Sequence, residues 1–125
     1  MPRKKSPTLT EAELRLMEVL WERGESTVND VVDALPPGSP LAYSSVLTTL
    51  RILDQKGYVR HQKRGRAFLY SPVIAREEAQ RSAVRFVMSR FFENSPEMLV
   101  LNVLENDDLS PEELKRLRQM IEDAD

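Results

Sequence analysis

The sequence of 125 residues lacks cysteine altogether, which excludes a disulfide framework and any thiolate metal site. Its four glycines are scattered, so it has no glycine-rich loop to cradle a phosphate. A single histidine, His61, has no second imidazole with which to hold a metal. No apolar run is long enough to span a membrane, and no apolar stretch follows the basic start, so a signal peptide is not indicated. We expect a cytoplasmic protein without cofactor, metal, catalytic residues or membrane insertion.

Charge is nearly balanced over the whole chain, at a net value of −2, but it is unevenly distributed. Residues 1–72 hold eleven Lys/Arg against eight Asp/Glu, a net charge of +3. Residues 73–125 hold seven against twelve, a net charge of −5. Such asymmetry indicates one part of the chain that faces nucleic acid and one part with a different role.

Capping signals and apolar spacing predict three helices in the first half of the chain. The first begins at the capping box Thr10–Glu13 and ends at Gly24. The second is capped by Ser26–Thr27 and stops before the proline-rich stretch 36–40. The third runs from about Ala42 to Lys56, and the glycine that follows can end it in the left-handed conformation.

The third predicted helix has two contrasting faces. At 100° per residue, Tyr43, Val46, Leu50 and Leu53 share one face, and Ser44, Thr48, Arg51 and Gln55 share the opposite one. The second face carries hydrogen-bonding groups and no carboxylate, whereas a solvated helix face usually mixes acids with bases. This pattern favours a nucleic-acid contact, and an ordinary amphipathic helix is the alternative.

Two short β-type segments, 58–62 and 67–71, follow the third helix and flank the basic turn Lys63–Arg66. Three helices and a basic-tipped hairpin, in this order, are typical of a winged helix-turn-helix, whose third helix enters the major groove. We therefore predict a mainly α fold with a small β wing: a winged helix-turn-helix plus a C-terminal helical dimerisation region. The predicted domains are a DNA-binding domain over 1–72, with a flexible basic arm over 1–8, and a helical dimerisation domain over 73–125.

The predicted DNA contacts come from the third helix and the hairpin turn. They are Tyr43, Ser44, Ser45, Thr48, Arg51, Lys63, Arg64 and Arg66. Hydroxyl groups can reach base edges or phosphates, and Arg51 can pair bidentately with guanine. The basic turn is expected on phosphates, with a solvated turn as the alternative. We expect His61 to be an ordinary strand residue and Trp21 and Phe68 to lie in the core.

The last fifty residues predict a long helix over 74–92, a short apolar segment after Ser95–Glu97, and a final helix from the capping box Ser110–Glu113. About fifty residues are too few for a self-contained core, so their apolar faces need a partner surface. The simplest partner is a second copy, because twofold homodimers are the commonest oligomers. The predicted dimer residues are Ala79, Ala83, Phe86, Phe91, Leu99, Leu101, Val103, Leu104, Leu117 and Ile121.

Several separated motifs occur in a fixed order along the chain. They are Leu9–Glu13 with Leu20–Trp21, Tyr43–Val46 with Lys56–Val59, Gly65–Pro72, and Leu101–Asp107 with Leu109–Leu114. Together they resemble the penicillinase repressor family of winged-helix transcriptional repressors (the BlaI, MecI and CopY type), over about residues 8–122. The resemblance implies a dimeric repressor that sits on promoter DNA.

The resemblance also implies a route of release. In the antibiotic-sensing branch, a membrane-bound sensor metalloprotease signals the presence of antibiotic, and the repressor is then cleaved after an asparagine. Carried over to this sequence, the cleaved bond is Asn102–Val103. That branch has phenylalanine where this sequence has Val103. The copper-responsive branch carries a C-terminal cysteine cluster, which this sequence lacks.

The predicted function is that of a DNA-binding transcriptional repressor that acts as a homodimer on a roughly palindromic operator and is released by proteolysis in the dimerisation region. The alternative is a winged-helix module for protein–protein interaction that does not touch DNA.

Overall fold

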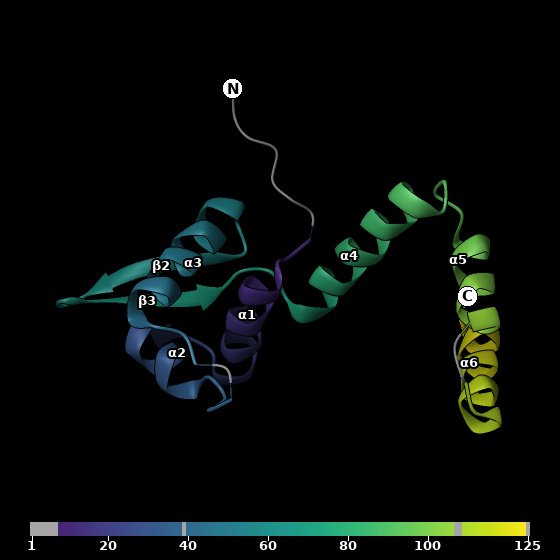
Figure 1. Ribbon diagram of the computed structural model, residues 1–125, viewed down its shortest axis with the longest axis horizontal. Helices are drawn as coiled ribbons and strands as arrows, with labels where there is room; N and C mark the ends of the chain where they lie inside the picture. Colours follow the sequence, from purple (N-terminus) through teal and green to yellow (C-terminus); the bar gives the residue numbers. More distant parts are fainter. Residues whose placement is uncertain (1–7, 39, 107–108, 125) are drawn as a thin grey trace. The chain divides into compact units, whose positions relative to one another are not determined.

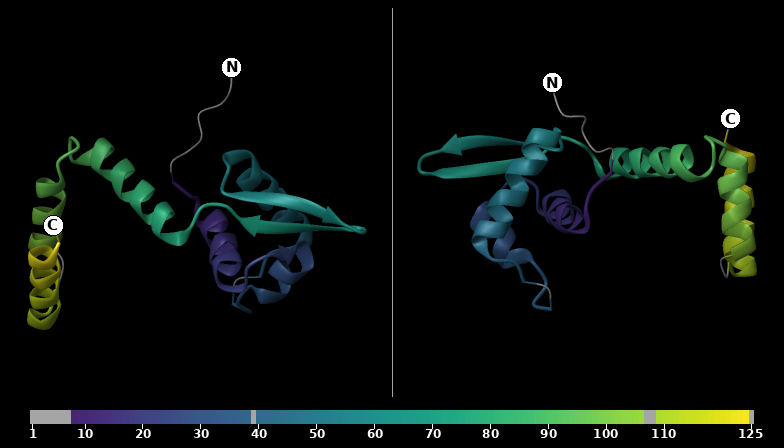
Figure 2. Two further views of the ribbon diagram at one scale, coloured as in Figure 1. Left: turned by 180° about the vertical axis from the view of Figure 1, so that it is seen from behind. Right: turned by 45° about the horizontal axis from the view of Figure 1, so that its top comes forward.

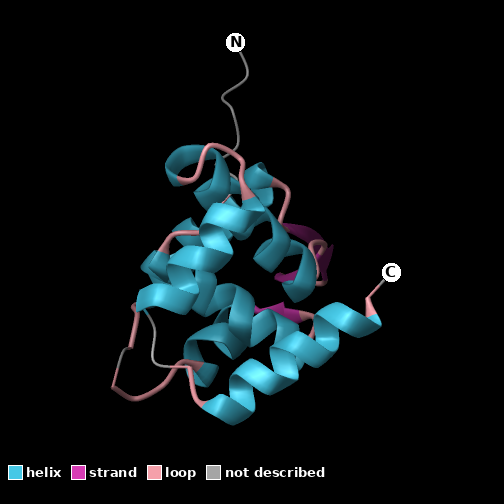
Figure 3. Ribbon diagram, turned by 90° about the vertical axis from the view of Figure 1, so that its right-hand side faces the viewer, coloured by secondary structure: helices cyan, strands magenta, loops and turns pink. Residues whose placement is uncertain are grey.

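The computed structural model describes residues 8–38, 40–106 and 109–124, and the predicted basic arm at Arg3–Lys5 lies outside them. Helices make up most of the molecule, beside one small sheet (Figure 3). The chain forms two compact units, Met1–Phe86 and Val87–Asp125. Their boundary lies within a helix, downstream of the predicted functional division after Pro72, which stays a prediction.

Helix α1 (Glu11–Arg23) begins at the predicted capping box. The Thr10 hydroxyl accepts the backbone N–H of Glu13 at 3.1 Å, and the Glu13 carboxylate accepts the N–H of Thr10 at 2.9 Å. Glu13 is also buried, and its Oε1 lies 2.7 Å from Lys56 Nζ at the end of the third helix. One carboxylate therefore caps the first helix and joins it to the third. Gly24 ends α1 with φ of 82°.

Helices α2 (Val28–Ala34) and α3 (Tyr43–Lys56) complete the three-helix part of the first unit. All three helices supply fully buried side chains to one core: Leu16, Met17, Leu20, Val31, Val46, Leu50 and Leu53. Helix α3 begins one residue after the predicted Ala42 and ends at the predicted Lys56, and Gly57 follows it in the left-handed conformation with φ of 85°.

The sheet has three antiparallel strands in the order β1-β3-β2: β1 (Ser26–Thr27), β2 (Val59–Arg64) and β3 (Ala67–Pro72). Strand β1 was not predicted, because two residues are too few to show alternation. The β2–β3 hairpin extends beyond the helices of its unit (Figures 1 and 2). Its ladder continues to the pair Arg64 and Ala67. The prediction of a four-residue turn was therefore wrong: Lys63 and Arg64 are strand residues, and Gly65 with Arg66 makes the turn.

Three further helices follow: α4 (Arg76–Phe91), α5 (Pro96–Asn106) and α6 (Pro111–Asp123). Ser95 accepts the N–H of Met98 at 3.1 Å, and Ser110 forms the predicted capping box with Glu113. None of the described residues of these three helices is buried. Among the helices that the structure describes, none has both the length and the apolarity that crossing a membrane requires.

Candidate nucleic-acid interface

Helix α3 presents its predicted DNA-contacting side chains to the outside. Five side chains are exposed, while Val46 and Leu50 between them enter the core: Tyr43, Ser44, Ser45, Thr48 and Arg51. Tyr43 is half exposed, although its helical angle groups it with the apolar face. The outward surface of α3 therefore includes hydroxyls, one phenol and one guanidinium, together with the exposed side chains of Ile52 and Gln55.

The fold brings part of the helix and part of the wing together. Tyr43 and Arg51 of α3 line one shallow depression with Arg66 of the wing turn. The start of α2 contributes Asn29 to the same depression, a residue that sequence reasoning missed because it lies on a different predicted helix. A ligand seated there would meet two guanidinium groups and three further side chains that can donate hydrogen bonds, those of Thr27, Asn29 and Tyr43.

The other two wing cations lie along β2 and have neighbours of their own. Arg64 Nη2 is 3.9 Å from Glu25 Oε1, and the Ser71 hydroxyl donates to the other oxygen of this carboxylate at 3.2 Å. Lys63 Nζ lies 6.0 Å from the ring centroid of Phe68. Glu25 thus offsets part of the positive charge of the wing, whereas Lys63 faces a neutral ring.

The prediction that Phe68 lies in the core was wrong, because its side chain is 43% exposed. The strand register pairs Phe68 with Lys63 near the wing turn, and the Phe68 side chain lines both depressions that Arg51 also lines. Its ring packs edge-on against His61, with 5.7 Å between centroids. Phe68 therefore belongs to the wing surface.

A hydrogen bond between α3 and the wing was also missed. Asp54 is the one carboxylate within α3, and it hydrogen-bonds His61 Nδ1 on β2. Both line a depression with Arg51 and Tyr70. Burial raises the pKa of the Tyr70 phenol, with Asp54 adding to the rise and Arg51 opposing it. The carboxylate nearest to Arg51 along the helix is thus held by the wing, which keeps the outward face of α3 free of an unengaged acid.

The predicted dimer residues have different surroundings within the single chain. Ala79 packs against the core of the first unit. Ala83, Phe86, Leu99 and Val103 are half-buried. Phe91, Leu101, Leu104, Leu117 and Ile121 are exposed, Phe91 and Ile121 to 70% or more. The bond Asn102–Val103 lies inside α5, where the Asn102 carbonyl accepts from the Asn106 side chain at 2.9 Å.

Comparison with known proteins shows which family this chain is related to. The family model described as penicillinase repressor matches residues 9–123. The chain belongs to the penicillinase repressor family. This confirms the predicted resemblance and, with it, the prediction of a DNA-binding transcriptional repressor at the level of the family.

Two relatives and one solved structure show how far the likeness extends. The penicillinase repressor of Bacillus licheniformis is 35% identical over 120 residues, which is 96% of this chain and 94% of the relative. The methicillin resistance regulatory protein MecI of Staphylococcus aureus (strain N315) is 20% identical over 117 residues, covering 94% and 95%. The solution structure of the DNA-binding domain of the repressor BlaI matches with a TM-score of 0.53 and 34% identity, covering 61% of this chain and 93% of that one. The predicted winged-helix fold class is confirmed.

Proposed function

We propose that this member of the penicillinase repressor family binds a roughly palindromic operator as a cytoplasmic homodimer and represses transcription by occupying that DNA. The observation that carries the proposal is the acid-free outward face of α3, whose Tyr43 and Arg51 share a depression with Arg66 of the wing. In a winged helix-turn-helix the third helix reads the major groove, and phosphate contacts orient the protein.

The two parts of the interface have different roles in this proposal. Ser44, Ser45 and Thr48 reach base edges or phosphates through short hydroxyl side chains, and Arg51 supplies the guanidinium fork that matches guanine. Lys63, Arg64 and Arg66 neutralise phosphates and so supply affinity without encoding sequence.

The homodimer is supported by the exposed apolar side chains of the last three helices. Phe91, Leu101 and Ile121 are 74%, 48% and 70% exposed in the single chain. A twofold partner can cover this surface with the same surface of its own. The acidic residues 73–125 then form the dimerisation part and lie away from the DNA, because phosphate repels them.

We propose release by proteolysis at Asn102–Val103, with a membrane-bound sensor protease as the partner. The bond lies among the apolar residues of α5, so its cleavage cuts the proposed dimer region. A released monomer keeps one half-site contact and loses the gain of bivalent binding. Mass spectrometry of the protein after incubation with its sensor, under induction, tests this. Intact chain at the time of DNA release would contradict it.

The decisive experiment measures binding to the upstream DNA of the protein's own gene against a scrambled duplex, over a series of salt concentrations. A repressor prefers the native duplex by roughly a thousandfold or more. Its logarithmic affinity falls with the logarithm of salt by about 0.9 for each phosphate contact. Replacing Lys63, Arg64 and Arg66 by alanine should flatten this slope. Binding to neither duplex at low salt would favour the protein–protein interaction module instead.

A further inference from the structure

The connection from β3 to α4 is short, and its backbone is unusually well anchored. It comprises residues 73–75, between the end of β3 and the start of α4. The backbone N–H groups of Val73 and Ile74 both donate to the carbonyl of Tyr58, at 2.8 and 3.2 Å. The carbonyl of Ala75 accepts the N–H of Ala79 at 3.0 Å. These hydrogen bonds leave the backbone of residues 73–75 little freedom to rotate.

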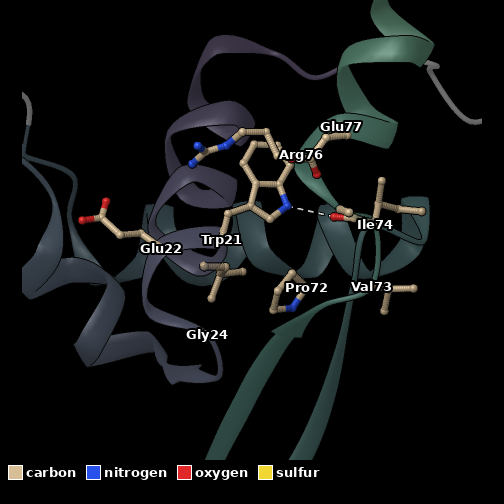
Figure 4. A pocket seen from close by; sticks show the side chains of 10 residues that line it. Trp21, Glu22, Gly24, Pro72, Val73, Ile74, Arg76 and Glu77 are labelled. Atoms are coloured by element: carbon tan, nitrogen blue, oxygen red, sulfur yellow. Dashed lines mark hydrogen bonds between the residues drawn. The ribbon is translucent and has the colours of Figure 1, made fainter.

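Trp21 of α1 anchors the same connection from the other side. Its indole Nε1–H donates to the carbonyl of Ile74 at 2.8 Å. Figure 4 shows the ring directed from α1 toward Ile74, with the Arg76 side chain beside it. The guanidinium carbon of Arg76 lies 5.3 Å from the ring centroid, within the range of a cation–π contact. We call Trp21, Ile74 and Arg76 the Trp21 latch.

The latch acts on the first turn of α4, because Arg76 is the first residue of that helix. One turn later, Ala79 packs against the core, and Trp21, Ala79 and Ala83 line one depression with residues of α1. The start of α4 therefore runs along α1, and the latch connects the two helices at the point where α4 begins.

We propose that the Trp21 latch sets the direction in which α4 leaves the DNA-binding unit and thereby determines which half-site spacing the dimer accepts. A helix of 16 residues is about 24 Å long. A change of direction by about 20° at its start moves the helix by about 6 Å at Phe86, the last residue of the first unit, which is nearly two base-pair steps. This inference rests on the proposed function, because spacing has meaning only for a dimer on two half-sites.

The test uses the full chain and duplexes selected by it from a randomised pool. One set of duplexes carries two selected half-sites. Their centre-to-centre spacing is the one found in the selected duplexes, called the native spacing, or differs from it by one or two base pairs in either direction. A further duplex carries a single half-site. The variants are W21F, which keeps an aromatic ring and removes the N–H donor, and R76A. R85A, an arginine on the same helix outside the latch, is the matched control for the lost charge.

Wild type and R85A should bind the native spacing at least tenfold more tightly than a spacing two base pairs away. W21F and R76A should reduce this preference to threefold or less, with affinity for the single half-site unchanged within twofold. Variants with the wild-type spacing profile would overturn the inference. If the wild type itself binds two half-sites no more tightly than one, the proposed dimeric function fails together with the inference.

A second measurement does not depend on DNA. Because the sequence has no cysteine, spin labels can be placed at Q62C and R81C on the wing and on α4, both exposed and both in the first unit. With labelled protein diluted in unlabelled protein, double electron–electron resonance should give a narrow distance distribution for wild type and one at least twice as wide for W21F. Equal widths in a W21F variant with native circular dichroism would overturn the inference.

Discussion

At the scale of single residues, we propose that Arg51 carries most of the base discrimination in the interface. It is exposed on α3 and belongs to both depressions between the helix and the wing. Its guanidinium is the one group on this face that can bind guanine with two parallel hydrogen bonds. The hydroxyl side chains of the neighbouring serines and threonine are shorter than that of Arg51, and a single hydroxyl group discriminates less between bases.

We expect R51A to weaken binding to the native duplex by about 1–3 kcal/mol, or roughly 5- to 150-fold, because a bidentate base contact is lost. Binding to scrambled DNA should change by less than about threefold, since one phosphate contact at most is removed. R51K keeps the charge without the fork and should restore little of the specific affinity. Competition titrations with both duplexes measure this, and R15A on α1 is the control. Equal loss on both duplexes would contradict base readout.

The pair of Asp54 and His61 leads to a second prediction at this scale. H61A leaves the Asp54 carboxylate without its partner, one helical turn from Arg51. The free carboxylate then attracts Arg51 and repels phosphate, so DNA affinity should fall by about three- to tenfold. The double variant D54N/H61A should recover most of the loss. Fluorescence anisotropy on one labelled duplex measures all three proteins, and a double variant as weak as H61A would contradict this role.

At the scale of elements, the capping boxes make the helices sensitive to acid. In α2 the Asp30 carboxylate accepts the N–H of Thr27 at 3.0 Å, and hydrogen bonds from the backbone and side chain of Thr27 hold the pKa of Asp30 below its ordinary value. In α6 the pKa of Glu113 is lowered in the same way by Ser110. A group with a lowered pKa in the folded state stabilises the fold above its unfolded pKa and loses that effect as the pH falls through the folded value.

We therefore expect D30N to lose less of its stability than wild type when the pH falls from about 5 to about 3, the range in which carboxylates take up protons. At neutral pH the variant should be the less stable protein. Urea unfolding at the two pH values measures the difference in midpoint. D33N, on the same helix and outside the capping box, is the matched control. The same acid dependence in D30N and D33N would contradict the role of the cap.

An element can be predicted from the sequence when the interactions that form it join residues close together in the chain. An element that depends on distant residues cannot. Helices α1 and α6 begin at their predicted capping boxes, and α3 ends at its predicted glycine, because each of these signals acts within four residues. Strand β1 forms only when Thr27 meets Leu69, more than forty residues away, so no local pattern indicates it.

The interface shows the same division between local and distant interactions. The exposed polar face of α3, with Ser44, Thr48 and Arg51, follows from helical periodicity, whereas the exposure of Tyr43 does not. The contacts of Asp54 with His61 and of Arg64 with Glu25 join different elements, and they depend on how the wing packs. Phe68 was misplaced for that reason: an aromatic residue in a strand is usually buried, but the wing packs so that this side chain stays 43% exposed beside Arg51.

At the scale of the whole molecule, the last three helices should decide the oligomeric state. Ile121 of α6 is 70% exposed and shares an apolar stripe with Leu117 and Leu114, each three to four residues apart. I121D places a charge in the proposed interface and should weaken the dimer at least about thirtyfold, the equivalent of a hot-spot residue of about 2 kcal/mol. Sedimentation velocity over a concentration series measures this.

The matched control is Q119D, which adds the same charge to another face of the same helix. It should leave the dimer unchanged within about threefold, and both variants should bind a single half-site as wild type does. Equal effects of I121D and Q119D would contradict the assignment of the apolar stripe to the dimer.

Under the proposed homodimer, the exposed apolar side chains of the last three helices have a consequence for the amount of protein in the cell. A chain that completes this surface only with a second copy is more stable at concentrations above its dimer Kd, by mass action. Below that concentration, single chains open more often and are removed by proteases faster. The level of repressor should then respond to gene dosage more steeply than in proportion, with a threshold near the dimer Kd. Dilution of the protein at each cell division would then bring it below this threshold after a set number of divisions, and repression would end.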